Sequence, residues 1–287
     1  MEASRIIKFG PSGNSESFYS SGHKHTEQAA KWLKDIGLNA FEYSFGRGII
    51  ISDETAEKIR VSFNRYNIEI SAHAPYYINF ANLDDEMIEK SIDYVIQTAS
   101  AVRAFGGKRI VFHPGSVGKT DRASALEVTK KNFLKLAERI YSTNNSDLYI
   151  CAESMGKINQ IGDYKEICEL CKLDKIFTPA IDFGHQNART LGGLKTTEDY
   201  EKILCHIIDV LGKEKADEMH IHFSKIAFSK GGEIKHLTFS DKEFGPEFNP
   251  LAEMLKKYDL KPYIICESSG TQAEDALEMK KIYQEIK

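Results

Sequence analysis

Apolar positions along the chain fall into short continuous runs, which alternate with longer stretches where apolar residues recur every three or four positions. The short runs are rich in β-branched residues and predict eight strands: Ile6–Phe9, Ala40–Phe45, Ile68–Ala74, Arg109–His113, Leu148–Glu153, Thr178–Phe183, Glu218–Phe223 and Pro262–Glu267. The stretches between and after them predict helices with one apolar face: Thr26–Ile36, Glu54–Tyr66, Asp85–Phe105, Ala123–Tyr141, Tyr164–Leu173, Thr197–Gly212, Pro250–Tyr258 and Gln272–Ile286.

This alternation of strand and helix predicts an α/β protein with parallel strands and right-handed crossovers. The strands read as mainly apolar runs, as expected when both faces of the sheet are covered. The segment after the first strand, Phe9–Gly13, lacks the glycine pattern of a phosphate-binding loop. Polar residues instead follow nearly every strand, which favours a closed (β/α)8 TIM barrel over an open sheet. Because no linker or composition shift divides the chain, we expect a single domain over residues 1–287.

Metal-binding side chains stand at the carboxyl ends of six predicted strands. In chain order the candidates are His73, His113, Glu153, Asp182 with His185, His220, and Glu267. His222 lies two residues after His220 and points to the same side of its strand, so it is a further candidate. In a barrel these strand ends surround one mouth. The sequence therefore predicts a cluster of imidazoles and carboxylates in a common cavity.

Such a cluster is expected to hold metal ions. Carboxylates buried close together repel one another and lose hydration, and divalent cations remove both penalties. Imidazole combined with carboxylate suits zinc, manganese or iron better than magnesium or calcium. A carboxylate shared by two ions is typical of hydrolytic centres.

The composition limits the classes of partner. The 287 residues carry a formal net charge of −4, which argues against a protein that coats nucleic acid. Binding of a short stretch of nucleic acid through a local patch remains compatible with this charge. No apolar run approaches the ~20 residues of a membrane span. The five cysteines form no dense disulfide framework and fit a reducing compartment. We therefore expect a cytoplasmic protein with no membrane partner.

Taken in order, the motifs resemble those of endonuclease IV, a metal-dependent apurinic/apyrimidinic endonuclease family built on a xylose isomerase-like barrel. The resemblance extends from about Asn39 to Glu267 and is closest to a branch with shorter loops. It rests on these segments: His73-Ala74-Pro75-Tyr76-Tyr77-Ile78-Asn79, His113-Pro114-Gly115-Ser116, Glu153, Asp182-x-x-His185, His220-x-x-x-Ser224-Lys225, His236 and Glu267.

The resemblance implies two or three zinc ions, with manganese or iron as alternatives. One ion would be held by His73, His113 and bridging Glu153, and a second by Glu153, Asp182, His220 and Glu267, while His185 and His236 would hold a third. Glu153 or Glu267 would also orient or deprotonate the attacking water. Tyr76 and Asn79 would meet duplex DNA at the lesion, and Lys225 is an expected phosphate contact.

The implied reaction is hydrolysis of the phosphodiester 5′ to an abasic site, together with trimming of blocked 3′ ends. This chemistry needs only one chain, so we expect a monomer. An abasic nucleotide lacks stacking and is easily turned out of the duplex.

Two positions depart from the family pattern. Where the family has an aspartate two residues before the last histidine, this chain has Ile234, and Glu233 is the substitute. The loop after the second strand is short, and Arg47 is expected to replace part of the longer DNA-wedging loop.

Two other interpretations stay open. A sugar isomerase or epimerase of the same barrel class would explain the short loop, although such enzymes usually need fewer ligands. A non-catalytic metal-binding or nucleic-acid-binding barrel would not require the complete ligand set.

Overall fold

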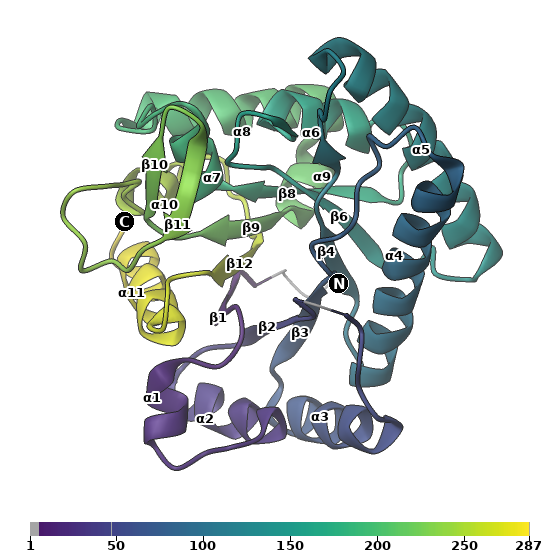
Figure 1. Cartoon of the computed structure of the whole chain (residues 1–287). Helices are drawn as coiled ribbons and strands as arrows, with labels where there is room; N and C mark the ends of the chain where they lie inside the picture. The colour runs from purple at the N-terminus through teal and green to yellow at the C-terminus, as the bar shows by residue number, and fades with distance from the viewer. Residues whose placement is uncertain (1–5, 47, 287) are drawn as a thin grey trace.

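The structure, a computed structural model, describes residues 6–46 and 48–286. Eight parallel strands form a barrel in the spatial order β1-β12-β9-β8-β6-β4-β3-β2, and helices surround it (Figure 1). The barrel strands are β1 (Lys8–Pro11), β2 (Ala40–Ser44), β3 (Glu69–His73), β4 (Arg109–Phe112), β6 (Tyr149–Glu153), β8 (Phe177–Asp182), β9 (His220–Phe223) and β12 (Tyr263–Cys266). The predicted (β/α)8 barrel is thus confirmed, and the strands differ from the prediction mainly at their ends.

The edges of the sheet meet between β1 and β2. Asn39 donates its backbone N–H to the carbonyl of Phe9 at 3.1 Å, and Gly13 donates to the carbonyl of Glu42 at 2.9 Å. A side chain at Gly10 would place its Cβ 1.9 Å from the carbonyl oxygen of Ala40. Glycine at this position therefore permits the close approach that brings the two edge strands together.

The surrounding helices bury the apolar faces that the sequence pattern predicts. They are α1 (Glu16–Ser20), α2 (Ala29–Ile36), α3 (Asp53–Tyr66), α4 (Asp85–Phe105), α5 (Arg122–Ser142), α6 (Tyr164–Cys171), α7 (Phe183–Arg189), α8 (Thr197–Leu211), α9 (Lys213–Glu218), α10 (Asn249–Lys257) and α11 (Gln272–Glu285), with a 3-10 turn, η1 (Thr26–Gln28), before α2. The turn η1 shortens the helix predicted from Thr26. None of these helices is both long and apolar enough to span a membrane.

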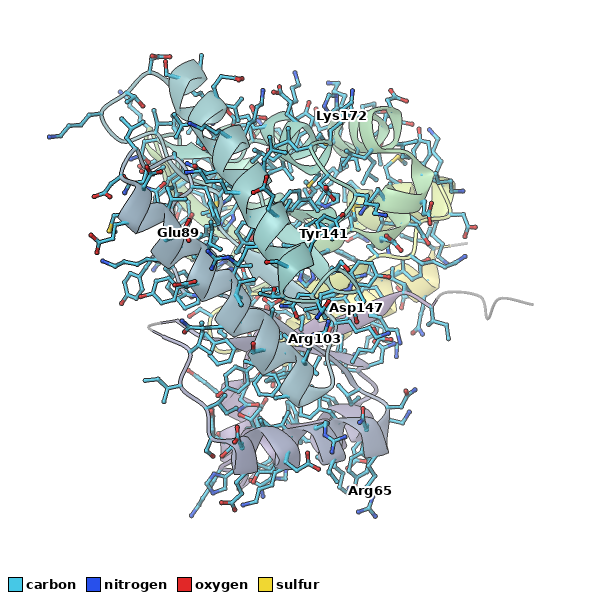
Figure 2. The ribbon with its side chains drawn as sticks, turned by 90° about the vertical axis from the view of Figure 1, so that its right-hand side faces the viewer. Arg65, Glu89, Arg103, Tyr141, Asp147 and Lys172 are labelled. Atoms are coloured by element: carbon cyan, nitrogen blue, oxygen red, sulfur yellow. The ribbon has the colours of Figure 1, made fainter. Side chains whose placement is uncertain are left out.

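Helices α4 and α5 show how the outer layer is held. They run side by side across the face turned to the viewer in Figure 2. Phe133 on α5 packs against the rings of Phe112 and Phe177 from the barrel, with centroid separations of 5.6 and 5.0 Å. On the outside, the Arg103 guanidinium at the end of α4 binds the Asp147 carboxylate before β6. Apolar packing beneath and charge pairing above therefore fix α4 and α5 against the strands.

Two small antiparallel sheets lie at the carboxyl ends of the barrel strands. The first pairs β5 (Gly115–Ser116) with β7 (Gln160–Ile161), and the second is a hairpin of β10 (Ile226–Ser229) and β11 (Gly232–His236). A bridge between Lys157 and Gly232 joins the β6–β7 loop to the β10–β11 hairpin. These pieces build one wall of the barrel mouth.

Candidate metal centre

The side chains at the mouth form three adjoining groups whose nitrogen and oxygen atoms lie close enough to share ions. The groups are His73, His113 and Glu153; then Glu153, Asp182, His222 and Glu267; and finally His185, Glu233 and His236. Glu153 belongs to the first two. The residues come from β3, β4, β6, β8, β9, β11 and β12 or from the segments directly after them, because parallel strands of a barrel end at one mouth.

Glu153 occupies the centre of the first group. Its Oε2 lies 3.0 Å from Nε2 of both His73 and His113. Its Oε1 lies 2.9 Å from Nδ1 of His222 in the second group. Burial alone would raise the pKa of this carboxyl, but the charge of His222 and the contacts with the histidines outweigh burial and hold the pKa well below its usual range. Glu153 therefore lies between the first two groups and contributes an oxygen to each.

Several of the histidines are oriented by a protein oxygen behind the ring. His73 Nδ1 lies 2.7 Å from the carbonyl oxygen of Ala74, and His185 Nδ1 lies 2.9 Å from that of Ser154. The Ser224 hydroxyl lies 2.8 Å from Nδ1 of His236. Holding the outer nitrogen in this way leaves Nε2 free to face the site, which is how metal-ligating imidazoles are usually supported.

The second group contains His222 where the sequence analysis expected His220. Along β9, Asp182 is in register with His222, whereas His220 is in register with Ala180, two residues deeper in the barrel. Both histidines point inward because their spacing matches the strand period, but only His222 reaches the level of the carboxylates. His220 instead lies beside Glu42 on β2, 3.3 Å from Nε2 to Oε2, so its expected place in the second group is corrected.

The third group depends on a bulge in β11. Ala227 pairs with Lys235 but Phe228 pairs with Glu233, so Ile234 is an extra residue that no partner opposes. Ile234 turns out to solvent, and Glu233 reaches within 3.4 Å of His185 Nε2. The bulge thus brings the Glu233 carboxylate, rather than the side chain at position 234, beside His185 and His236.

Gly156, on the loop after β6, makes room for this group. A Cβ on Gly156 would lie 2.7 Å from the Glu233 Cβ and 2.9 Å from the His185 Cδ2. The backbone carbonyl of Gly156 accepts the N–H of Glu233 at 3.2 Å. Glycine therefore lets the β6–β7 loop pass directly behind the third group.

The residues expected to contact DNA differ in their exposure. Tyr76 is exposed at the mouth, with its ring centroid 5.6 Å from that of His113. Asn79 is half-buried, and its side-chain oxygen accepts the N–H groups of Ala81 and Ser116, both at 3.1 Å, so it holds the loop after β3. Arg47 lies outside the described residues.

Lys225 is buried, in contrast with its expected role as a phosphate contact. Its ammonium donates to the carbonyl of Asp241 at 2.9 Å and pairs with Glu247 at 2.8 Å. With its charge already committed inside the protein, Lys225 is not placed to grip a phosphate, and its position corrects that expectation.

The donor set fits divalent metal ions. Asp182 is fully buried, and its Oδ2 has no hydrogen-bond partner among the described residues. Burial raises the pKa of Glu267, whose carboxylate lies 3.6 Å from His222 Nδ1. A buried carboxylate oxygen that accepts no hydrogen bond and faces imidazoles and other carboxylates is costly unless a cation joins them. The mixed nitrogen and oxygen ligands suit zinc, manganese or iron.

Comparison with known proteins agrees with this architecture. Residues 30–284 match the family described as xylose isomerase-like TIM barrel. The chain belongs to this family. An uncharacterized protein from Methanocaldococcus jannaschii is 33% identical to this xylose isomerase-like barrel over 261 residues, covering 90% of this chain and 92% of that protein.

Relatives with named activities are more distant. A probable endonuclease 4 from Staphylococcus carnosus is 29% identical over 183 residues, covering 61% of this chain and 59% of that protein. The resemblance to endonuclease IV is thereby confirmed. Among solved structures, Thermus thermophilus endonuclease IV aligns with a TM-score of 0.68 at 17% identity, covering 96% of this chain and 97% of that one. A D-tagatose 3-epimerase-like protein aligns with a TM-score of 0.72 at 18% identity over 97% and 96%. The two structural matches show the shared fold.

Proposed function

We propose that this xylose isomerase-like barrel is a metal-dependent endonuclease that hydrolyses the phosphodiester 5′ to an abasic site in duplex DNA and removes 3′-blocking groups. The observation that carries the proposal is the set of three adjoining ligand groups, two of which share Glu153. A phosphodiester needs charge neutralised at several oxygens during in-line displacement, and adjoining sites suit that demand. The named endonuclease 4 relatives support the same assignment.

Divalent zinc, or manganese or iron in its place, would be held by these groups and would supply Lewis-acid chemistry: it would neutralise phosphate charge and lower the pKa of water, so that hydroxide is available for attack near neutral pH. The protein's own residues position the ligand groups and the attacking water. Glu153 fixes the spacing of the first two groups through both carboxylate oxygens. Glu267 keeps part of its side chain exposed at the mouth, which supports a role in orienting the attacking water.

The rim of the mouth suits a lesion in duplex DNA. Tyr76 and Tyr77 are exposed on the loop after β3 and offer aromatic faces to a distorted base step. Lys157, on the β6–β7 loop, and Lys235, on β11, are exposed on the two segments that meet at the third group. These lysines supply local positive charge for the phosphate backbone although the whole chain is acidic.

The proposal is tested by cleavage of a duplex oligonucleotide that carries one abasic-site analogue. We expect cleavage on the 5′ side of the analogue, loss of cleavage after chelation, and recovery with zinc or manganese. Glu153→Gln should abolish cleavage, while His206→Gln, on α8 beside Tyr164 and outside the three groups, should leave it unchanged. Absence of cleavage by protein that holds its metal ions would contradict the proposal.

A sugar isomerase or epimerase is the second candidate. Glu153, Asp182, His222 and Glu267 form by themselves a complete site for one divalent ion. Such a site, taken with the aligned epimerase-like structure, would serve a small sugar substrate without the third group. A variant that loses the third group, Glu233→Gln, separates the two candidates. It should impair phosphodiester cleavage but leave sugar isomerisation intact.

A further inference from the structure

A second polar cluster lies inside the barrel directly beneath the metal centre. It consists of Glu42 from β2, Ser71 from β3, and His220 and His222 from β9, all fully buried. Barrel interiors are normally filled by layers of branched apolar side chains. A carboxylate in that place is costly unless its surroundings use it. Glu42 is therefore the residue whose presence calls for an explanation.

His222 connects this cluster to the metal centre. Its Nδ1 faces upward, 2.9 Å from Glu153 and 3.6 Å from Glu267. Its Nε2 faces downward, 2.9 Å from Oε1 of Glu42. Neither Nε2 nor that oxygen forms a hydrogen bond with a described residue, so these two unsatisfied atoms face each other at ion-pair distance.

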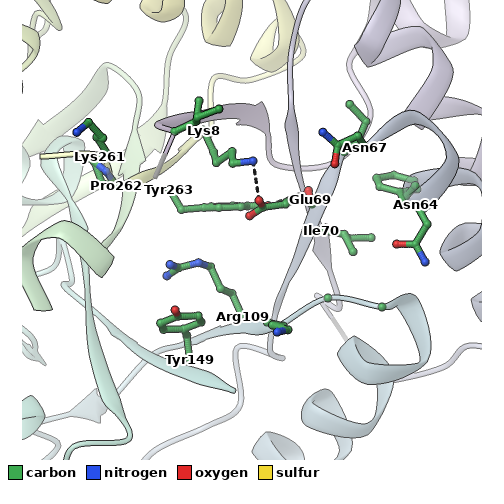
Figure 3. A pocket seen from close by; sticks show the side chains of 16 residues that line it. Lys8, Asn64, Asn67, Glu69, Ile70, Arg109, Tyr149, Lys261, Pro262 and Tyr263 are labelled. Carbon is green, nitrogen blue, oxygen red and sulfur yellow. Dashed lines mark hydrogen bonds and ion pairs between the residues drawn. The ribbon is translucent and has the colours of Figure 1, made fainter. Parts of the chain in front are cut away.

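The remaining contacts of Glu42 hold its carboxylate in place. The Ser71 hydroxyl donates to Oε2 at 2.9 Å, and Nε2 of His220 lies 3.3 Å from the same oxygen. Below, the ring of His220 lies 5.2 Å from that of Tyr263. Tyr263 lines a cavity of about 420 Å³ at the opposite end of the barrel, together with Lys8, Glu69 and Arg109 (Figure 3). Contacts therefore support Glu42 on the side away from the metal centre.

We infer that Glu42 is a positioning residue that keeps the proton of His222 on Nε2 and so presents an unprotonated Nδ1 to the metal centre. A carboxylate behind a ligating imidazole fixes its tautomer and ring orientation and strengthens it as a donor. His73 and His185 are held by backbone carbonyls, and His236 by a serine hydroxyl. Glu42 gives His222 an anionic partner instead. The inference rests on the proposed metal centre but not on the reaction catalysed there.

The same three side chains, Glu42, His220 and His222, also lie close enough to hold an ion of their own. Two arguments favour positioning. The Ser71 hydroxyl already donates to Oε2 of Glu42. Ions on both sides of His222 would also require its imidazole to lose its last proton, whereas one ion on Nδ1 leaves Nε2–H to face Glu42. A separate deep ion is therefore an outcome that the experiment must be able to detect.

The test compares metal binding by Glu42→Gln and the wild type. Chelator-treated protein is titrated with Co²⁺, and the visible absorption and the number of bound ions are recorded. We expect the variant to bind as many ions as the wild type at saturation, with one site weakened about 10–100-fold and its cobalt spectrum altered. Thr178→Val is a matched control, because Thr178 is a buried polar residue of β8 outside the cluster, and should behave as the wild type.

Three results would overturn the inference. Unchanged affinity in Glu42→Gln would show that the carboxylate does not support His222. Loss of one full ion at saturation, with the other sites unaffected, would make Glu42 a ligand of a separate deep ion. A wild type that binds no Co²⁺ would remove the metal centre and the inference with it. If the wild type binds metal ions and Glu42→Gln weakens that binding, but the wild type does not cleave abasic DNA, the proposed function is contradicted and the inference about Glu42 stands.

Ser71→Ala provides a second route if Glu42→Gln does not fold. This variant removes only the hydroxyl that donates to Glu42. We expect a weakening of the same site by a few fold, in the same direction as for Glu42→Gln. No change in affinity would contradict the positioning role independently.

Discussion

Replacing Gly156 by alanine tests whether the β6–β7 loop determines the third ligand group. The added Cβ would lie 2.7 Å from the Cβ of Glu233, 2.9 Å from its Oε2 and 2.9 Å from the Cδ2 of His185. Real Cβ atoms essentially never approach a neighbour this closely. Because one of the neighbours is a Cβ, a change of rotamer at Glu233 cannot relieve the contact. The β10–β11 hairpin must move away from the loop.

The cost follows from overpacking. Forcing one extra carbon into a tight contact typically destabilises a protein by about 1–3 kcal/mol. For a chain of this size 1 kcal/mol corresponds to roughly 2 °C in Tm, so Tm should fall by roughly 2–6 °C. Movement of the hairpin also separates Glu233 from His185, now 3.4 Å apart. The variant should therefore bind one ion fewer per chain.

The assay is metal content after dialysis against dilute zinc, with thermal unfolding measured on the same samples. Gly231→Ala is the matched control, since it lies in the same hairpin and its added Cβ would meet nothing nearer than the Ser229 Oγ at 3.8 Å. The control should keep both its ions and its Tm. If Gly156→Ala retains the wild-type ion count and Tm, the argument that glycine makes room for the third group is refuted.

Four further outcomes are expected. Glu153→Gln should lower the ion count by at least one, because two groups share this carboxylate; an unchanged count in metal analysis would contradict the bridging role. Tyr76→Ala should weaken binding to abasic DNA about tenfold or more, through loss of an exposed aromatic face, with metal content as the control; equal affinity in a fluorescence titration would remove this contact. Lys225→Ala should lower Tm but leave the salt dependence of DNA binding unchanged, because its charge is paired internally; a shallower salt slope would restore Lys225 as a phosphate contact. Phe133→Ala should cost about 3–5 kcal/mol in denaturant unfolding, since Phe133 packs against the rings of Phe80, Phe112 and Phe177; a loss below about 1 kcal/mol would contradict its place in the core.

Much of the candidate site was predictable because parallel barrel strands end at one mouth. His73, His113, Glu153, Asp182 and Glu267 follow or end apolar runs, and the structure brings them together in two adjoining groups. No knowledge of strand register is needed for this step, because the direction of each strand already decides which end its last residue occupies. That these five side chains bind metal ions remains a prediction.

The depth of each side chain in the barrel was not predictable. No local sequence feature distinguishes His220 from His222. The register of β9 against β8 decides which of the two lies beside Asp182. Glu42 carried one signal, a carboxylate inside an otherwise apolar strand. Its partners, Ser71 and His222, come from other strands and become visible only in the folded barrel.

The sequence by itself determined the order of strands and helices, the barrel, and the kinds of side chain at its mouth, because these follow from local periodicity and strand direction. Tertiary structure alone decided that His222 faces the carboxylates, that a bulge at Ile234 presents Glu233, and that Lys225 is buried. These features depend on register and packing between segments far apart in the chain. A shift of one or two residues in strand register would change these features without altering the hydrophobic pattern of the sequence.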